Sequence, residues 1–228
     1  MTRRVEVEWP DPRPFRERHG RPIRLLAMSD EADHALEFEA NRRALEPIDG
    51  LIGCGDLEPS WLDFIADCFR APLVYVRGNH DHGGAWEDKS VLVPRWLASG
   101  GRERVAGIAI GGLEWPGIDE PGNQRSPWLA WRHSVALAGR QLPSLLIGRS
   151  EPLLVISHAP PEGVGDVPTD AYHVGFAGYR WLLHRLRPPL WLHGHTTTAS
   201  VPSLIARDGP TMLVNVTGAV LVELCPPG

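Results

Sequence analysis

Polar residues that could bind a metal ion recur directly after short apolar segments in this chain of 228 residues. Three examples are GLIGCGD at 50–56, PLVYVRGNHD at 72–81 and PLWLHGH at 189–195. The polar residues at such ends are Asp30, Asp56, Asn79, His80, Asp81, His158, His193 and His195. Carboxylate, carboxamide and imidazole groups are ligands that suit Mn²⁺, iron and Zn²⁺, and none of these residues is cysteine. The pattern therefore predicts a divalent-metal centre without thiolate ligands.

The apolar segments that precede these residues have the length of buried strands, about four to six residues each. They lie within residues 23–30, 50–56, 72–81, 152–161 and 189–195. Residues 33–45, 59–69, 126–142 and 175–187 lie between them and repeat apolar residues at helical spacing. Ligands of open α/β sheets bind beyond the carboxyl ends of the strands, so we expect the polar residues to converge at one edge.

The remaining segments complete an α/β architecture. Residues 103–118 alternate weakly between apolar and polar, and residues 200–224 read as consecutive strands joined by turns. Residues 1–22 are rich in Arg and Pro and are expected to form an irregular lead-in, followed by a single domain over residues 23–228. This order predicts two sheets packed together with helices outside.

Composition excludes several classes of protein. The chain is 43% hydrophobic and 22% charged, as in globular proteins, and its net charge of -5 gives no strong signal for nucleic-acid binding. Its apolar segments are too short to span a membrane, and its N-terminus has no apolar leader. Three cysteines without a zinc spacing are expected to be free thiols, which indicates a cytoplasmic protein. The oligomeric state is not indicated.

A set of short motifs resembles that of the calcineurin-like metallophosphoesterases. The motifs are GD at 55–56, GNHD at 78–81, SHAPP at 157–161 and HGH at 193–195, in this order after SD at 29–30. The resemblance extends over about residues 23–218. It implies a four-layer αββα sandwich of two mixed sheets flanked by helices, and hydrolysis of a phosphate ester by a metal-bound hydroxide.

The resemblance also implies a role for each matching residue. Asp56 would bridge two ions, and Asn79, His158 and His195 would complete one of the two metal sites. Asp30 would serve the other site; in an enzyme with one ion, it would orient or deprotonate the attacking water. His80 would not bind a metal. It would donate a proton to the leaving oxygen or stabilise the phosphate, with the carboxylate of Asp81 holding its ring.

Two departures from the family pattern affect a single metal site. Ala32 stands where the first motif has a histidine, and Thr197 stands where the last motif has one. We therefore expect one firmly bound divalent ion, with Mn²⁺ favoured over iron or Zn²⁺, and a second site that is weak, absent or rebuilt. The residues that could rebuild it are Glu31, Asp33, His34 and His173.

Two further residues could contact the substrate. Arg125 could hold a phosphate if residues 116–127 form a lid, although this segment could equally be a surface loop. His173 could line the pocket or cap the following helix. The favoured substrate is a phosphodiester that is a small molecule or nucleotide-like. The alternatives are a phosphomonoesterase of the same family and a non-catalytic protein that binds a metal or a phosphoryl ligand.

Overall fold

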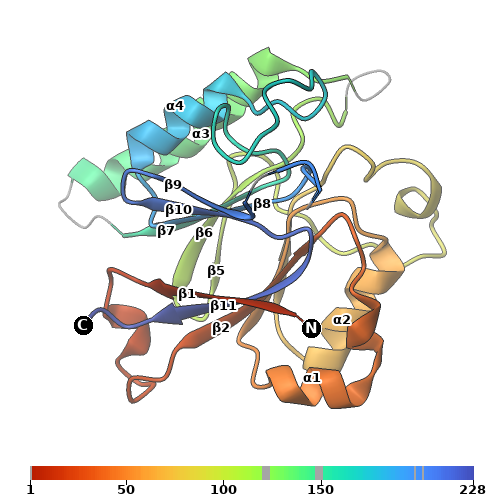
Figure 1. The fold of residues 1–228 in the computed structure, drawn as a ribbon, viewed down its shortest axis with the longest axis vertical. Helices are drawn as coiled ribbons and strands as arrows, with labels where there is room; N and C mark the ends of the chain where they lie inside the picture. Colours follow the sequence, from red (N-terminus) through yellow and green to blue (C-terminus); the bar gives the residue numbers. More distant parts are fainter. Residues whose placement is uncertain (1, 120–123, 147–150, 198, 202) are drawn as a thin grey trace.

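A five-stranded and a six-stranded sheet lie face to face in the computed structural model, which describes residues 2–119, 124–146, 151–197, 199–201 and 203–228 (Figure 1). The first sheet has the order β1 (Arg3–Glu8), β11 (Gly218–Cys225), β2 (Ile23–Ser29), β3 (Gly50–Gly53) and β4 (Leu73–Tyr75). The second has the order β5 (Arg102–Val105), β6 (Ile108–Leu113), β7 (Leu153–Ser157), β8 (Leu190–His193), β10 (Thr211–Asn215) and β9 (Ile205–Asp208). Both sheets mix parallel and antiparallel pairs.

Helices cover the outer sides of the two sheets. Figure 1 shows α3 (Pro127–Leu146) and α4 (Ala177–Leu186) over the second sheet, and α1 (Glu39–Leu45) and α2 (Pro59–Phe69) beside the first. Three 3₁₀ turns complete the described elements: η1 (Arg13–Phe15), η2 (His34–Glu37) and η3 (Gly84–Trp86). The predicted αββα sandwich of two mixed sheets is therefore confirmed. No helix within the described residues is long and apolar enough to cross a membrane.

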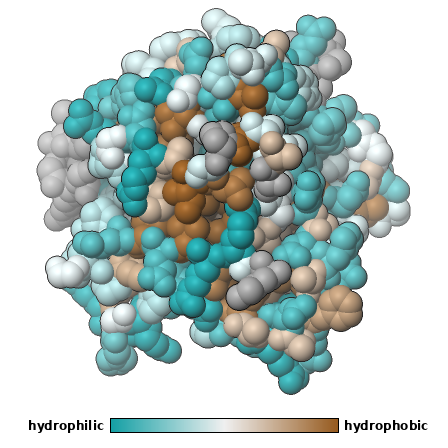
Figure 2. All heavy atoms as spheres, viewed as in Figure 1, coloured by the Kyte–Doolittle hydropathy of each residue, from teal (hydrophilic) through white to brown (hydrophobic). Residues whose placement is uncertain are grey.

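The apolar core forms three layers, because neighbouring residues of a strand point to opposite faces of its sheet. In β3, Ile52 joins the cluster between the sheets, whereas Leu51 joins the cluster under α2. In β8, Leu192 likewise faces the other sheet and Trp191 faces the helices. On the side of the molecule shown in Figure 2, hydrophobic residues gather in the middle, where the two sheets meet in Figure 1.

The N-terminal segment differs from its expected irregular conformation. Residues 1–22 contain β1, which pairs in parallel with β11. The alternation of buried Val5 and Val7 with exposed Glu6 and Glu8 is the pattern of a half-buried strand. The Arg and Pro residues around it obscured this signal.

The helix expected over residues 33–45 is interrupted. Phe38 has an extended backbone (φ -87°, ψ 122°) and separates η2 from α1. The guanidinium of Arg42 donates hydrogen bonds to the carbonyl oxygens of Leu36 and Glu37, at 2.7 and 2.8 Å. These bonds satisfy backbone acceptors that a continuous helix would have satisfied itself.

The strand directions bring the predicted site residues to one edge. β2 is parallel to β3 in the first sheet, and β7 is parallel to β8 in the second. Asp30 and His158 follow the last residues of β2 and β7 directly. Asp56 follows β3, and His195 follows β8, after two residues and one residue respectively.

Candidate metal centre

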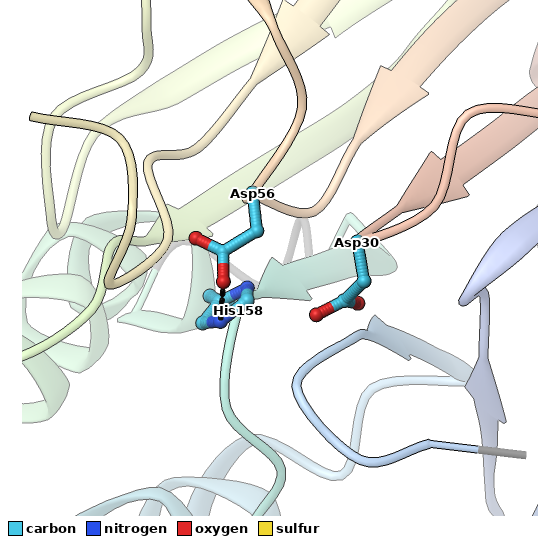
Figure 3. Close-up of side chains that lie close together, drawn as sticks. All are labelled: Asp30, Asp56 and His158. Carbon is cyan, nitrogen blue, oxygen red and sulfur yellow. Dashed lines mark ion pairs between the residues drawn. The ribbon is translucent and has the colours of Figure 1, made fainter. Parts of the chain in front are cut away.

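Asp30, Asp56 and His158 form a compact group at this edge. One potential ligand atom from each of the three residues lies within 4.8 Å of the others. Figure 3 shows both carboxylates directed toward the same space, with the ring of His158 beside Asp56. Two carboxylates and one imidazole are a suitable donor set for a divalent cation.

The backbone at these ends is unusual. Asp30, Asp56 and His195 have φ angles of 61°, 59° and 66°, in the left-handed region that residues other than glycine seldom adopt. Such conformations cost about 1–3 kcal/mol each and cluster at functional sites. Three such residues follow the ends of strands at this edge. Their backbone conformations are unfavourable in energy but orient these side chains toward the site.

Nearby donors fix the carboxylate of Asp30. Its Oδ2 accepts hydrogen bonds from the Ser29 hydroxyl at 2.6 Å, the His195 backbone N–H at 3.0 Å and the Thr217 hydroxyl at 3.1 Å. Burial raises the pKa of Asp30 above its ordinary value, although attraction from His158 and the hydrogen bonds from Ser29 and His195 oppose the rise. The carboxylate is therefore held in one orientation, but its negative charge is only partly stabilised against burial, as expected for a group that faces a cation.

The ring of His158 shows why a cation fits. Its Nδ1 lies 2.8 Å from the carbonyl oxygen of Cys54, which can only accept, so Nδ1 carries a proton. Its Nε2 faces Oδ2 of Asp56 at 3.2 Å and Oδ1 of Asn79 at 2.8 Å. Without a cation, Nε2 must carry a second proton, because its lone pair would otherwise face the lone pairs of the two oxygen atoms. A metal ion can take the place of that proton.

The electrostatics of the pair agree with this arrangement. Burial alone would lower the pKa of His158, but the carboxylates of Asp56 and Asp30 outweigh it and raise the pKa to about 9. Burial would likewise raise the pKa of Asp56, yet the attraction of His158 and the hydrogen bond from His80 leave it below its ordinary value. The pocket thus favours positive charge at the point that Nε2 faces.

The other two predicted ligands lie beside this group. Asn79 is buried, and its amide nitrogen donates to the hydroxyl of Tyr172 at 2.7 Å, so its oxygen is turned toward His158. The ring of His195 lies 5.0 Å from that of His158, but its Nε2 is 3.1 Å from the carbonyl oxygen of Tyr172. For His195 to bind the same ion through Nε2, this hydrogen bond must break.

His80 and Asp81 do not form the expected pair. His80 is exposed, and its backbone N–H donates to Oδ1 of Asp56 at 2.8 Å. Asp81 is buried, and its Oδ2 accepts from the Tyr75 hydroxyl at 2.5 Å, Gly78 N at 2.7 Å and Asp56 N at 2.9 Å. The structure thus corrects the expected role of Asp81: its carboxylate ties the loop after β4 to the backbone of Asp56. Burial raises the pKa of Asp81 to about 6 despite these donors.

Arg125 is also engaged elsewhere. Its guanidinium donates to the backbone carbonyl oxygens of Val174 and of Gly175, the latter at 2.6 Å, and lies 3.9 Å from the ring centroid of Phe176. These contacts make Arg125 a clamp on the 172–176 segment, and its expected role as a phosphate ligand stays a prediction. His173, the other expected substrate contact, pairs through Nδ1 with Asp170 at 2.5 Å and packs 5.1 Å from the ring of His195.

Most side chains that were candidates for a second metal site form local hydrogen bonds instead. The Thr197 hydroxyl donates to Ser200 at 2.9 Å, and Asp33 caps η2 by accepting from Ala35 N at 3.1 Å. His34 pairs with Glu37 at 2.7 Å. The group of potential metal ligands found among the described residues contains none of these side chains.

Sequence reasoning missed several residues that organise the site. Tyr172 bonds both Asn79 and His195, Tyr75 bonds Asp81, and Trp115 packs 4.8 Å from the ring of His195. Tyrosine and tryptophan at these positions carry no local motif that indicates such contacts. Thr217 follows a strand end in the same way as the predicted residues, and that signal could have identified it.

A cavity of about 420 Å³ opens onto the metal group, since Asp30 and Asp56 are among its lining residues together with His80 and Asp81. A second cavity, of about 430 Å³, is lined by residues such as Pro152, Leu153 and Pro189, at the opposite ends of β7 and β8. Only the first of these two cavities touches the metal group.

Comparisons with known proteins agree with this geometry. The family model of the calcineurin-like phosphoesterases matches residues 48–198. The crystal structure of TT1561 from Thermus thermophilus resembles the chain with a TM-score of 0.56 at 16% identity, over 86% of this chain and 90% of that one. A dimetal phosphatase from Danio rerio has a TM-score of 0.50 at 12% identity, over 87% of this chain and 88% of that one.

The two structural similarities, at such low identity, show a shared fold alone. A comparison with curated protein sequences gave no match. The family match, however, extends over more than half of the 228 residues and includes the motifs at the ends of β3, β4, β7 and β8. This chain therefore belongs to the calcineurin-like phosphoesterase family.

Proposed function

We propose that this protein is a metal-dependent hydrolase of small phosphate esters, with phosphodiesters, including nucleotide-like ones, as the favoured substrates. One observation carries the proposal: Asp30, Asp56 and His158 present their ligand atoms to one point, at the edge of a cavity of about 420 Å³. Family membership supports the general reaction, and the geometry of the three residues supports a cation-dependent mechanism.

The donor set supports Mn²⁺ as the cation, with iron and Zn²⁺ as the other cations that oxygen and nitrogen ligands accept. One firmly bound ion is proposed, with Asn79 and His195 close enough to complete its ligands. Ala32 offers no ligand atom for a second ion, and Thr197 is exposed and bonded to Ser200. A bound divalent ion lowers the pKa of a water molecule and neutralises phosphoryl charge.

The protein's own residues then supply orientation and a proton. Besides contributing a ligand atom to the ion, the fixed carboxylate of Asp30 would accept a hydrogen bond from the attacking water and hold it in line with phosphorus. The exposed ring of His80 lines the cavity beside Asp56 and would donate a proton to the leaving oxygen. His158, fixed by the carbonyl oxygen of Cys54, would offer Nε2 as a ligand to a bound ion.

The charge of the cavity favours diesters over monoesters. None of its lining residues, all of which the structure describes, is Arg or Lys, whereas Asp30, Asp56, Glu58 and Asp81 are among them. With Asp30 and Asp56 assigned to the cation, Glu58 and Asp81 remain, and they would repel a monoester dianion more strongly than a diester monoanion. We further propose a reducing compartment, the cytoplasm, because Cys54, Cys68 and Cys225 are free thiols.

The test is hydrolysis of bis(p-nitrophenyl) phosphate and p-nitrophenyl phosphate by the Mn²⁺-loaded protein. We expect faster turnover of the diester, loss of turnover in Asp56→Asn, and a decrease of about 100-fold in His80→Ala. His82→Ala, two residues away and also exposed, is the matched control and should retain the wild-type rate. A protein that binds Mn²⁺ but hydrolyses neither ester would contradict the proposal and favour a non-catalytic phosphoryl-binding function.

A further inference from the structure

The cavity beside the metal group has an aromatic side that the hydrolytic mechanism does not use. Trp61 and Trp86 line it together with His34, Glu58 and Ser60, in addition to the residues of the metal group. The cavity is therefore continuous from the metal group to two indole rings. Its volume of about 420 Å³ lies within the range of small-molecule sites.

Trp86 is held rigidly against the metal-binding loop. Its ring stacks on Tyr75, with centroids 5.5 Å apart and an interplanar angle of 16°, and meets the edge of Trp96 at 6.4 Å. The hydroxyl of Tyr75 bonds both Asp81 and the backbone N–H of Leu57, at 2.5 and 3.2 Å. The position of this indole is thus coupled to the segment that carries Asp56.

Trp61 belongs to α2 and also packs against other rings. It lies in the first turn of the helix, five residues after Asp56, and packs against Phe64 at 5.7 Å between ring centroids. The ring of His34 meets its edge at 6.0 Å. Both tryptophans are half-buried, so each has one part of its surface fixed by the protein and another part open.

From this arrangement we propose that the Trp61–Trp86 side of the cavity binds an aromatic substituent of the phosphodiester, such as an aryl group or a nucleobase. The phosphoryl group would lie at the metal group, so the inference rests on the proposed function for that part of the ligand. Preorganised aromatic rings bind planar π-systems by stacking and lose little conformational entropy in doing so. The absence of Arg and Lys from the lining leaves stacking as the main source of affinity beyond the cation.

The experiment compares two phosphodiesters of equal charge, diphenyl phosphate and diethyl phosphate, by isothermal titration calorimetry on the Mn²⁺-loaded protein. We expect diphenyl phosphate to bind about 10-fold more tightly than diethyl phosphate to the wild type. Trp86→Ala and Trp61→Ala should remove most of this preference, which is measured in each variant as the ratio of its two affinities. Trp128→Ala, an exposed tryptophan on α3 away from the cavity, is the control and should keep the preference.

Trp86→Leu and Trp61→Leu preserve apolar volume without an indole and should lose the preference as well. Circular dichroism and thermal unfolding check that each variant is folded. Equal affinity of the wild type for the two phosphates, or an unchanged preference in the Trp86 and Trp61 variants, would overturn the proposal. Because the preference is a ratio of binding affinities and does not require hydrolysis, a preserved preference in a protein that hydrolyses no ester would refute the hydrolase and leave the subsite standing.

Discussion

Nε2 of His158 lies 3.2 Å from Oδ2 of Asp56, and this contact joins the two sheets of the sandwich. His158 follows β7 of the second sheet, whereas Asp56 follows β3 of the first. The candidate metal centre therefore depends on how closely the two sheets approach at this edge. Small residues at the strand ends set that approach.

Gly194, directly after β8, is one of these small residues. A Cβ atom there would lie 1.8 Å from Oγ of Ser29 and 2.4 Å from Oδ2 of Asp30, which real contacts do not allow. We expect Gly194→Ala to displace Asp30 and to weaken Mn²⁺ binding at least about 10-fold, as calorimetry would measure. Gly139→Ala is the control, because a Cβ at this position on α3 meets nothing within 4 Å. Unchanged Mn²⁺ affinity in Gly194→Ala would show that the close approach of Gly194 to Asp30 is not required.

Tyr75→Phe tests the buried network around Asp81. The substitution removes the hydroxyl that donates to Oδ2 of Asp81 and accepts from Leu57 N. Because buried groups that lose a partner are destabilised, we expect the free energy of unfolding to fall by about 1–3 kcal/mol. Urea denaturation of the metal-free protein measures it. A value equal to that of the wild type would mean that the bond between Tyr75 and Asp81 contributes no stability.

Substitution of Arg125 distinguishes a clamp on the 172–176 segment from the expected phosphate ligand. Arg125→Ala removes the donors to Val174 and Gly175, so the amide N–H of Val174, bonded to Asp170, should exchange faster with deuterium. Arg125→Lys should not restore protection, because a single ammonium cannot reproduce the planar guanidinium that bonds two carbonyls and stacks on Phe176. Unchanged exchange together with a raised KM for the ester would instead return Arg125 to substrate binding.

His133 on α3 predicts a pH dependence of stability remote from the metal group. Burial, followed by repulsion from Arg132, lowers the pKa of His133 from 6.5 to about 4 in the folded protein. Between these values the unfolded chain binds a proton at His133 that the folded chain does not. The contribution of neutral His133 to the free energy of unfolding is therefore complete above pH 6.5 and decreases as the pH falls toward 4.

His133→Gln should therefore lose less stability than the wild type between about pH 7 and pH 5 in urea denaturation. His19→Gln, at an exposed position near the N-terminus, is the control and should behave like the wild type. Parallel pH profiles for the wild type and His133→Gln would show that His133 does not cause the dependence.

The sequence allowed prediction of the sandwich and of the strand ends that meet in the metal group, because both depend on local signals. Buried strands appear as short apolar runs, and Asp30, Asp56 and His158 follow such runs closely. The residues that orient them come from distant parts of the chain. Thr217, for example, bonds Asp30 across 187 positions, and only the pairing of β11 with β2 brings them together.

The roles of Asp81 and Arg125 could not be predicted for a related reason. Asp81 neighbours His80 in sequence, but backbone N–H groups of the surrounding loop compete for its carboxylate and, together with Tyr75, bind it. Arg125 lies in a segment that could form a lid, but loop carbonyls at 174 and 175 accept its hydrogen bonds. Buried backbone groups require partners, and sequence motifs do not show which side chains will supply them.

Asp30, Asp56 and His158 are proposed to hold one divalent ion. The metal content per folded chain, measured by plasma mass spectrometry after loading with Mn²⁺ and removal of free ion, tests this proposal. We expect about one ion per chain in the wild type and almost none in Asp56→Asn, since the negative charge of one of the three grouped ligands is lost. A wild type without bound metal, or an Asp56→Asn variant that retains it, would show that these residues do not form a metal site.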